Sequence, residues 1–223
     1  MRPFRLPRRV PQSSDSRRFF NVVASEWEAL RERMFGRPLL DGLLSALDAR
    51  PGLRALDVGA GTGFVTSGLL EEGLVVTALD DSAAMREQLA ARFAGRGVEI
   101  VPGDVEALEF PDGSFDRVAG NMFLHHVERP ERAIAELARV LRPGGVLAIG
   151  DLDEHGSEEV RAAHHDRWMG FPRERVAAWL GAAGFEAVRL ETAAEACRSD
   201  GCGGAQELGV FLASGRKPLV RNS

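Results

Sequence analysis

Apolar runs of strand length alternate with amphipathic runs along most of this chain. Five strands are expected at 53–58, 75–80, 98–102, 115–120 and 146–152, with helices among them at 62–72, 82–94 and 130–141. Alternation of this kind is typical of βαβ crossovers, which bring their strands together in parallel. The pattern therefore predicts an α/β domain built on a parallel sheet.

Further elements are expected at both ends of this core. Helices are predicted before it at about 15–34 and 38–48, and after it at 158–169 and 173–183. Two last strands, 187–191 and 209–215, are joined by a long loop through CRSDGCGG, which fits a final hairpin with an antiparallel strand. We divide the chain into a basic, partly disordered arm (1–14), an N-terminal helical cap (15–48), the main ligand-binding domain (49–217) and a tail (218–223).

Charge and hydrophobicity narrow the class of protein. The 223 residues are 44% hydrophobic, which is enough for one domain with a full core. No apolar run is long enough for a membrane span or a signal peptide, so we expect a cytoplasmic protein. Six arginines against one aspartate give the first twenty residues a charge of +5, which leaves −10 for the rest of a chain of net charge −5. Because phosphates need a basic face, the acidic body argues against a nucleic-acid partner.

A glycine-rich turn follows the first predicted strand, in ALDVGAGTGF. The turn Gly59-Ala60-Gly61-Thr62-Gly63 leads from a strand into a helix, an arrangement in which a nucleotide-like ligand lies against the backbone at the helix N-terminus. Its spacing is G-x-G-x-G, because the sixth position is Phe64 and not the glycine or alanine of the dinucleotide fingerprint. Asp57, two residues before the turn, would repel a pyrophosphate and suits a cationic or amine-bearing ligand. NAD is therefore disfavoured.

Acidic residues also end the next two predicted strands. Asp80, in TALDD, is placed to accept hydrogen bonds from both hydroxyls of a ribose, and Asp81 follows it. Asp104, in VPGDVEAL, is placed to accept from the exocyclic amine of a base, with Val105 beside it. Helix capping is the alternative role, and it suits Ser82 and Asp81. Three acids at three successive strand ends, together with the glycine turn, indicate a nucleoside-binding edge.

These motifs have the order and spacing of a known family. LDVGAGTG, ALD, GDVEALEFPDGSFDRV, FLHHV and LRPGG resemble class I S-adenosylmethionine-dependent methyltransferases of the ubiquinone/menaquinone-methyltransferase type. The resemblance covers about residues 50–150. It implies a Rossmann-like fold with a seven-stranded, mostly parallel sheet in the order 3-2-1-4-5-7-6 and an antiparallel last strand. It also implies that Gly59, Gly61 and Gly63 line the methionine part of S-adenosylmethionine, that Asp80 holds the ribose, that Asp104 and Val105 hold the adenine, and that the Asn121 carbonyl receives the amino group.

The chemistry expected of such an enzyme depends mainly on alignment. A sulfonium methyl group is already activated, so the protein positions the acceptor and excludes water, and a base helps only if the acceptor must lose a proton. His125 and His126, beyond the fourth strand, are the candidate catalytic residues, since histidine titrates near neutrality; helix capping is their alternative role. FFNVVASEWEALR resembles the N-terminal helix that folds over the cofactor in such enzymes. Within it, Phe20 and Trp27 are expected to shield the methyl group, although core packing suits them equally.

The absence of two motifs narrows the class of molecule that could accept the methyl group. Asn121 is followed by Met122-Phe123-Leu124 and not by the Pro-Pro-aromatic run of base amino-methyltransferases, and no Pro-Cys pair for cytosine methylation follows the fourth strand. A small-molecule acceptor remains. The sequence leaves the atom that is methylated and the oligomeric state open.

Two other functions stay open beside the small-molecule enzyme. Residues 151–185 resemble the tail of methyltransferases that are fused to arsenic-type metalloregulators, and Cys197 and Cys202, with a histidine from 155–165, would suit a soft metalloid. Arsenite methyltransferases use three or four cysteines, whereas this chain has two, and two free thiols without a catalytic part are the alternative. No other metal site is predicted. A non-catalytic cofactor-binding scaffold is the third possibility.

Overall fold

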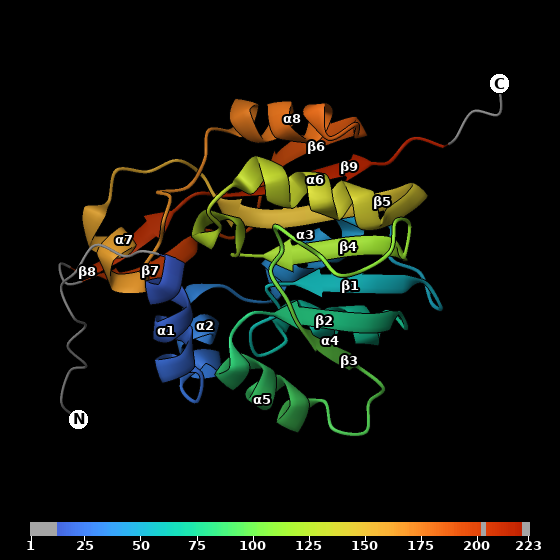
Figure 1. Cartoon of the computed structure of the whole chain (residues 1–223). Helices are drawn as coiled ribbons and strands as arrows, with labels where there is room; N and C mark the ends of the chain where they lie inside the picture. The colour runs from blue at the N-terminus through green and yellow to red at the C-terminus, as the bar shows by residue number, and fades with distance from the viewer. Residues whose placement is uncertain (1–12, 202–203, 220–223) are drawn as a thin grey trace.

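The central sheet has the predicted topology. The computed structural model describes residues 13–201 and 204–219, so the first twelve residues of the predicted basic arm and Cys202 lie outside the described residues. The sheet order is β3-β2-β1-β4-β5-β9-β6, with β9 antiparallel to β5 and β6 and the other pairs parallel (Figure 1). Its strands are β1 (Arg54–Val58), β2 (Val75–Asp80), β3 (Glu99–Pro102), β4 (Phe115–Asn121), β5 (Leu141–Leu152), β6 (Glu186–Thr192) and β9 (Val210–Arg216). Counting β9 as the seventh strand of this sheet, the order implied by the family resemblance is confirmed.

Helices cover both faces of the sheet because its inner strands are apolar on both sides. Leu56 and Val58 of β1 pack toward α6 (Pro130–Val140) and α8 (Arg173–Ala182), whereas Ala55 faces α3 (Arg37–Ala46) and α4 (Phe64–Glu71). This alternation follows from the two-residue period of a strand. Helix α5 (Ala83–Arg92) packs with Leu89 against Ala78 of β2. The carboxyl ends of β1, β2 and β4 are thereby fixed side by side at one edge.

The N-terminal helical cap differs from the predicted single helix over 15–34. It forms α1 (Ser13–Val23) and α2 (Trp27–Met34), separated by a turn in which the Glu26 and Trp27 amides donate to the carbonyls of Val23 and Ala24. Val23 and Ala24 are buried there against Met85 of α5. The helical periodicity of the sequence does not mark this interruption, which tertiary packing stabilises.

Two elements after β5 also depart from the expectations. The helix predicted at 158–169 ends early, as α7 (Glu158–His164), because His165 adopts a left-handed conformation with φ of 58° and the Asp166 amide closes on the Arg161 carbonyl. The predicted long loop is instead a second, two-stranded sheet of β7 (Cys197–Gly201) and β8 (Gly204–Leu208). These two strands were not predicted because their sequence is polar and rich in glycine and lacks a clear apolar alternation.

The β7–β8 hairpin folds back to the edge where β1, β2 and β4 end. It contacts α2 and α7 (Figure 1), and Glu195 just before it accepts a hydrogen bond of 2.8 Å from the Gly36 amide. The hairpin therefore ties the N-terminal helices to the C-terminal half of the chain. Among the described residues, no helix has the length and apolar character needed to cross a membrane.

Candidate functional site

The glycine turn after β1 depends on backbone conformations that favour glycine. Gly59, Gly61 and Gly63 have φ angles of 62°, 54° and 92°, all in the left-handed region. A Cβ atom on Gly59 would also stand 2.6 Å from the Cβ of Phe123, which is closer than packed atoms approach. The turn therefore brings bare backbone to the edge of the sheet at the start of α4.

A cavity of about 410 Å³ opens above this turn. It is lined by most of the predicted site residues, namely Phe20, Trp27, Asp57, Gly59, Ala60, Gly61, Thr62, Asp80, Asp81, Asp104, Val105, Asn121 and His126. Two predicted residues do not line it. Gly63 lies beneath the turn against Phe93, and His125 points into a smaller cavity beside the first.

Asp80 is held rigidly at the end of β2. Its two carboxylate oxygens accept hydrogen bonds from the backbone amides of Gly61, at 2.8 Å, and Ser82, at 2.9 Å. Burial raises the pKa of Asp80 to about 6, so the group is mostly ionised at neutral pH. Because a carboxylate has about four lone-pair positions, two bonds to the backbone leave it free to accept further donors from the cavity.

Asp57 and Asn121 carry buried oxygen atoms without a hydrogen-bond partner. One Asp57 oxygen accepts from the Thr66 hydroxyl at 2.6 Å, whereas its Oδ1 has no partner, and burial raises the pKa of Asp57 to about 7. Asn121 Oδ1 is likewise buried and unpaired. Buried acceptors normally have donors, so these two atoms fit a ligand that donates hydrogen bonds.

Two polar clusters that the sequence did not reveal hold the cap helices against the carboxyl ends of β1 and β2. Glu28 accepts a hydrogen bond from the Thr62 hydroxyl at 2.7 Å and pairs with Arg31 at 2.6 Å and Arg92 at 3.0 Å. Asn21 accepts from the Ser82 hydroxyl at 2.8 Å. Both residues lie within the predicted cap, but no motif marks them. They hold α1 and α2 over the glycine turn.

His125 and His126 lie at the end of β4 in the short 3-10 helix η1 (Leu124–His126), and they differ in environment. His125 Nδ1 is 2.6 Å from Asp151 Oδ1, and its Nε2 is 3.6 Å from Asp166 Oδ1. Burial would lower the pKa of His125, but the charges of Asp151 and Asp166 and the hydrogen bond to Asp151 raise it to about 9. His125 therefore holds its second proton at neutral pH.

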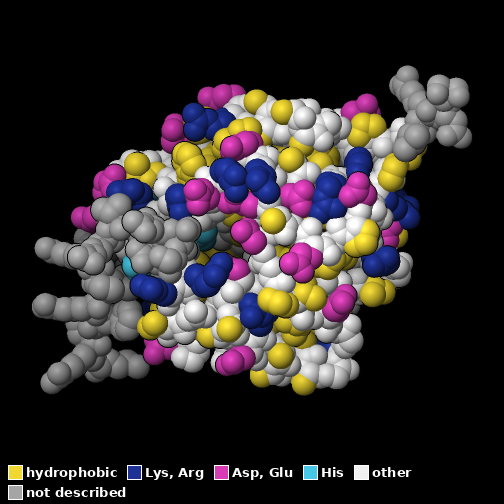
Figure 2. All heavy atoms as spheres, viewed as in Figure 1, with side chains coloured by type: hydrophobic (Ala, Val, Ile, Leu, Met, Phe, Trp, Pro, Cys, Tyr) yellow, Lys and Arg dark blue, Asp and Glu magenta, His cyan; other side chains and the backbone are white. Residues whose placement is uncertain are grey.

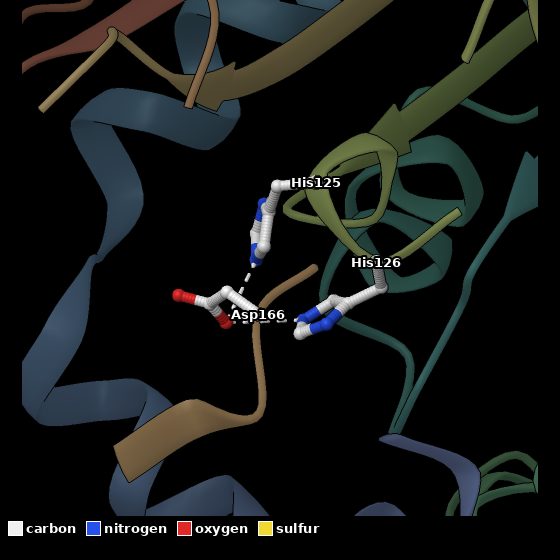
Figure 3. Close-up of side chains that lie close together, drawn as sticks. All are labelled: His125, His126 and Asp166. Carbon is white, nitrogen blue, oxygen red and sulfur yellow. Dashed lines mark ion pairs between the residues drawn. The ribbon is translucent and has the colours of Figure 1, made fainter. Parts of the chain in front are cut away.

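His126 is the histidine that reaches the large cavity. Its Nε2 is 3.8 Å from Asp166 Oδ1 and its Nδ1 is 3.2 Å from the Ser16 hydroxyl (the Asp166 pair is drawn in Figure 3). Burial and the neighbouring charge of His125 lower the pKa of His126 well below 6.5, so the ring is neutral at pH 7. Of the two predicted bases, the geometry leaves only His126 with access to a ligand in this cavity.

Cys197 is buried in the smaller cavity, beside the histidines and Asp166. Burial, followed by the charges of Asp166 and Asp151, raises the pKa of its thiol to about 12. Soft metalloids bind thiolates, whereas this thiol keeps its proton at neutral pH. The described residues therefore give the two-cysteine alternative no support, since Cys202 lies outside them.

On the face shown in Figure 2, arginine and lysine side chains are interspersed with aspartate and glutamate. Nucleic-acid binding needs a stripe of one sign, which this view does not show. This face therefore offers no basic surface for a nucleic acid, and the candidate site consists of the cavity residues.

Comparisons with known proteins agree with this geometry. Residues 56–149 match the family model described as a methyltransferase domain. The chain is 33% identical over 196 residues to the chloroplastic 2-methyl-6-phytyl-1,4-hydroquinone methyltransferase 2 of Oryza sativa subsp. japonica, covering 85% of this chain and 56% of that protein. It is 38% identical over 164 residues to the ubiquinone/menaquinone biosynthesis C-methyltransferase UbiE of Methylobacterium nodulans, covering 66% and 64% of the two chains. The chain thus spans less than two thirds of the length of these relatives.

A solved structure with the same fold shows how far the likeness extends. Phosphoethanolamine N-methyltransferase 2 of Haemonchus contortus, in complex with phosphomonomethylethanolamine and S-adenosylhomocysteine, superposes with a TM-score of 0.74 at 16% identity, over 95% of this chain and 61% of that one. At this identity the likeness concerns the fold alone. Together with the strand order, it shows that the chain has the Rossmann-like fold of class I methyltransferases, and residues 56–149 of that fold match a methyltransferase domain.

Proposed function

We propose that the chain transfers a methyl group from S-adenosylmethionine to a small aromatic acceptor of the hydroquinone class. The observation that carries the proposal is the composition of the cavity. The cavity is lined by Asp57, Asp80 and the glycine turn together with the rings of Phe20 and Trp27 and the neutral imidazole of His126, and the Trp27 indole stands next to Gly61 of the turn. A polar part suited to the cofactor and an aromatic part suited to the acceptor thus meet in one space of about 410 Å³.

The polar half fits S-adenosylmethionine by the chemistry of its acceptors. Asp80 would accept from the two ribose hydroxyls, and the unpaired oxygen of Asp57 would face the cationic methionine end. Asn121 would receive the amino group, as its family resemblance implies. Asp104, whose Oδ1 accepts from the Glu106 amide at 2.9 Å, would offer its other oxygen to the adenine amine beside Val105.

When bound, the cofactor supplies an activated methyl group, and the protein's task is to orient and shield it. Phe20 and Trp27 stand at the acceptor side as an edge-to-face pair with ring centroids 5.2 Å apart. Phe20 also meets the His126 ring edge-to-face at 5.0 Å. These rings exclude water and leave an apolar, aromatic surface for a phenolic ring.

His126 is the group that would take a proton from the acceptor hydroxyl. Its lowered pKa keeps it neutral at pH 7, which a proton acceptor requires. Asp166, 3.8 Å from His126 Nε2, would stabilise the imidazolium that forms. The acceptor would lose its hydroxyl proton to His126 and take the methyl group, on its oxygen or on a ring carbon, as the methyl–sulfur bond breaks and S-adenosylhomocysteine is left. If the methyl group goes to a ring carbon, the hydrogen of that carbon would then leave as a proton and the oxygen would regain one.

Two names among the relatives support this acceptor class. The rice protein is named for 2-methyl-6-phytyl-1,4-hydroquinone and the bacterial one for ubiquinone and menaquinone biosynthesis. From these names we propose only that the acceptor contains a hydroquinone ring, without specifying the side chain on that ring. The alternatives of a metalloid acceptor and of a non-catalytic scaffold gain no observation of their own.

The experiment is methyl transfer from radiolabelled S-adenosylmethionine to a panel of prenylated and simple hydroquinones, under reducing conditions. The expected result is a labelled hydroquinone product in the parent and at least tenfold less of it in Asp80→Ala when S-adenosylmethionine is below saturation. The control is Asp112→Asn, because the Asp112 side chain is 80% exposed, pairs with Arg139 and does not line the cavity. Cofactor binding without transfer to any hydroquinone would refute the acceptor class, and absence of cofactor binding would refute the proposal as a whole.

A further inference from the structure

We propose that His125, His126 and Asp166 form a binding site for one divalent transition-metal ion. The two histidines come from η1, and Asp166 follows α7. One ligand atom from each, two imidazole nitrogens and a carboxylate oxygen, lie within 4.8 Å of one another. Figure 3 shows the three side chains converging from these separate segments.

The Asp166 carboxylate is the first observation that points to a cation. Asp166 is 1% exposed, and its Oδ1 has no hydrogen-bond partner. The nearest nitrogens, His125 Nε2 at 3.6 Å and His126 Nε2 at 3.8 Å, are beyond hydrogen-bond length. A buried carboxylate oxygen without a donor costs free energy, and a bound cation would remove that cost.

The outer hydrogen bonds of the histidines are the second observation. His125 Nδ1 lies 2.6 Å from Asp151 Oδ1, so that Nε2 is the nitrogen directed at Asp166. Asp151 is itself fixed by the amides of Leu124 and Leu152, both at 2.8 Å. A carboxylate that orients a histidine through its far nitrogen is the usual support of a metal ligand. The Ser16 hydroxyl, at 3.2 Å from His126 Nδ1, stands in the same relation to the second histidine.

The donor set and the spacing select the kind of ion. Two imidazole nitrogens and one carboxylate suit zinc and the neighbouring first-row metals, whereas magnesium and calcium prefer oxygen alone. Metal–ligand bonds of about 2.0–2.2 Å in a tetrahedral zinc site place its ligand atoms about 3.3–3.6 Å apart. The distances of 3.6 and 3.8 Å from Asp166 need only small inward movements of the side chains, and the two histidine nitrogens, which lie within 4.8 Å of each other, must close to the same range.

The site adjoins the cavity proposed for the acceptor. The three ligands line a smaller cavity of about 30 Å³, and His126 lines both cavities. Resting on the proposed function, an ion here would bind the acceptor hydroxyl and lower its pKa, so that water takes the released proton; His126 is then a metal ligand and takes the proton only in the metal-free protein. The alternative explanation is that the site holds no metal and that His125 is an imidazolium between two aspartates. This alternative predicts that the protein takes up no metal.

Metal binding is testable without cofactor or acceptor. The full chain is stripped with a chelator, dialysed, and titrated with zinc in calorimetry and with cobalt(II) in visible spectroscopy. The parent is expected to bind one equivalent of each, to develop the cobalt absorption of nitrogen and oxygen ligands, and to gain thermal stability with zinc. Asp166→Asn should weaken zinc binding at least tenfold. Asp112→Asn, which changes an exposed aspartate in the same way, should bind as the parent does.

His126→Gln is the second variant, because its side chain is less buried than that of Asp166 and its loss leaves the Asp151 network intact. It should also weaken zinc binding tenfold or more while circular dichroism stays that of the parent. A parent that takes up no stoichiometric zinc, or an Asp166→Asn protein that binds zinc as the parent does, would overturn the site. S-adenosylmethionine binding by the stripped protein, measured in parallel, keeps this result separate from the proposed function.

Discussion

Replacing Asp57 by asparagine should stabilise the free protein and weaken the binding of its cofactor. Asp57 is 1% exposed, one of its oxygens is unpaired, and burial raises its pKa from 3.8 to about 7. At pH 8 the Asp57 carboxylate is therefore ionised, and its desolvation destabilises the folded protein. A shift of about three pKa units corresponds to about 4 kcal/mol, since each unit corresponds to about 1.36 kcal/mol. Asparagine has nearly the same shape and carries no charge, so Asp57→Asn should recover up to that amount.

The pH dependence follows from the direction of the shift. Because the pKa of Asp57 is higher in the folded state than in the unfolded state, its contribution to stability is largest below about pH 3.8 and is lost as the pH rises to about 7. The free energies of unfolding of parent and variant should thus be similar near pH 4, diverge up to pH 7, and stay apart above it. Urea unfolding at pH 5 and pH 8 measures the difference, with Asp112→Asn as the surface control.

Cofactor affinity should move in the opposite direction. The charged oxygen of Asp57 is proposed to face the cationic end of S-adenosylmethionine, and hydrogen bonds to charged groups contribute about 1.5–3 kcal/mol. Asp57→Asn should therefore raise the dissociation constant about 10- to 150-fold in calorimetry at pH 8. A variant that is less stable than the parent at pH 8, or that binds the cofactor equally well, would refute this reasoning.

Four further changes test separate parts of the site. Asp80→Ala removes the acceptor proposed for the ribose, so the dissociation constant of S-adenosylmethionine should rise at least tenfold in calorimetry; an unchanged value in a folded variant would contradict the placement. His126→Ala should lower the rate on a hydroquinone about 10²–10⁴-fold and remove the acid limb, which lies below pH 6.5 because burial lowers the pKa of His126; an unaltered pH–rate profile would make this residue structural. Glu28→Gln weakens the pairing of α2 with the glycine turn and should speed cofactor release about fivefold in stopped-flow fluorescence, whereas equal release rates would mean that the cap does not gate the cofactor. Cys197→Ser should keep methyl transfer to a hydroquinone, since its thiol is protonated and buried, and lost activity in a folded variant would restore a role for the thiol.

The part of the cavity proposed for the cofactor was predictable in position because its residues are local to strand ends. Asp57, Asp80 and Asp104 each follow an apolar run, and parallel strands bring their carboxyl ends to one edge. The glycines were predictable because their φ angles leave little choice of residue. For this half, the spacing along the chain determines the arrangement in space.

The acceptor side was not predictable in the same way. Asp151 and Asp166 contact His125 although they lie 26 or more residues away from it in the sequence. Glu28 likewise bonds to Thr62, which lies 34 residues away. The sequence did not distinguish the two adjacent histidines, yet both line the small cavity and only His126 also reaches the large one. Only the packing of the cap and the C-terminal half decides between them.

The β7–β8 hairpin has a consequence for how such an enzyme can be redesigned. It is inserted between β6 and β9, two strands that pair directly with each other, so its length can change while the sheet keeps its register. The entropy of closing a loop grows slowly with its length, which makes such an insertion inexpensive. The hairpin contacts α2 and α7, and none of its strands pairs with β1, β2 or β3, whose carboxyl ends carry Asp57, Asp80 and Asp104. Exchanging residues 193–208 between homologues would therefore change the small cavity lined by Cys197 and Leu208 while Asp57, Asp80 and the glycine turn stay in place.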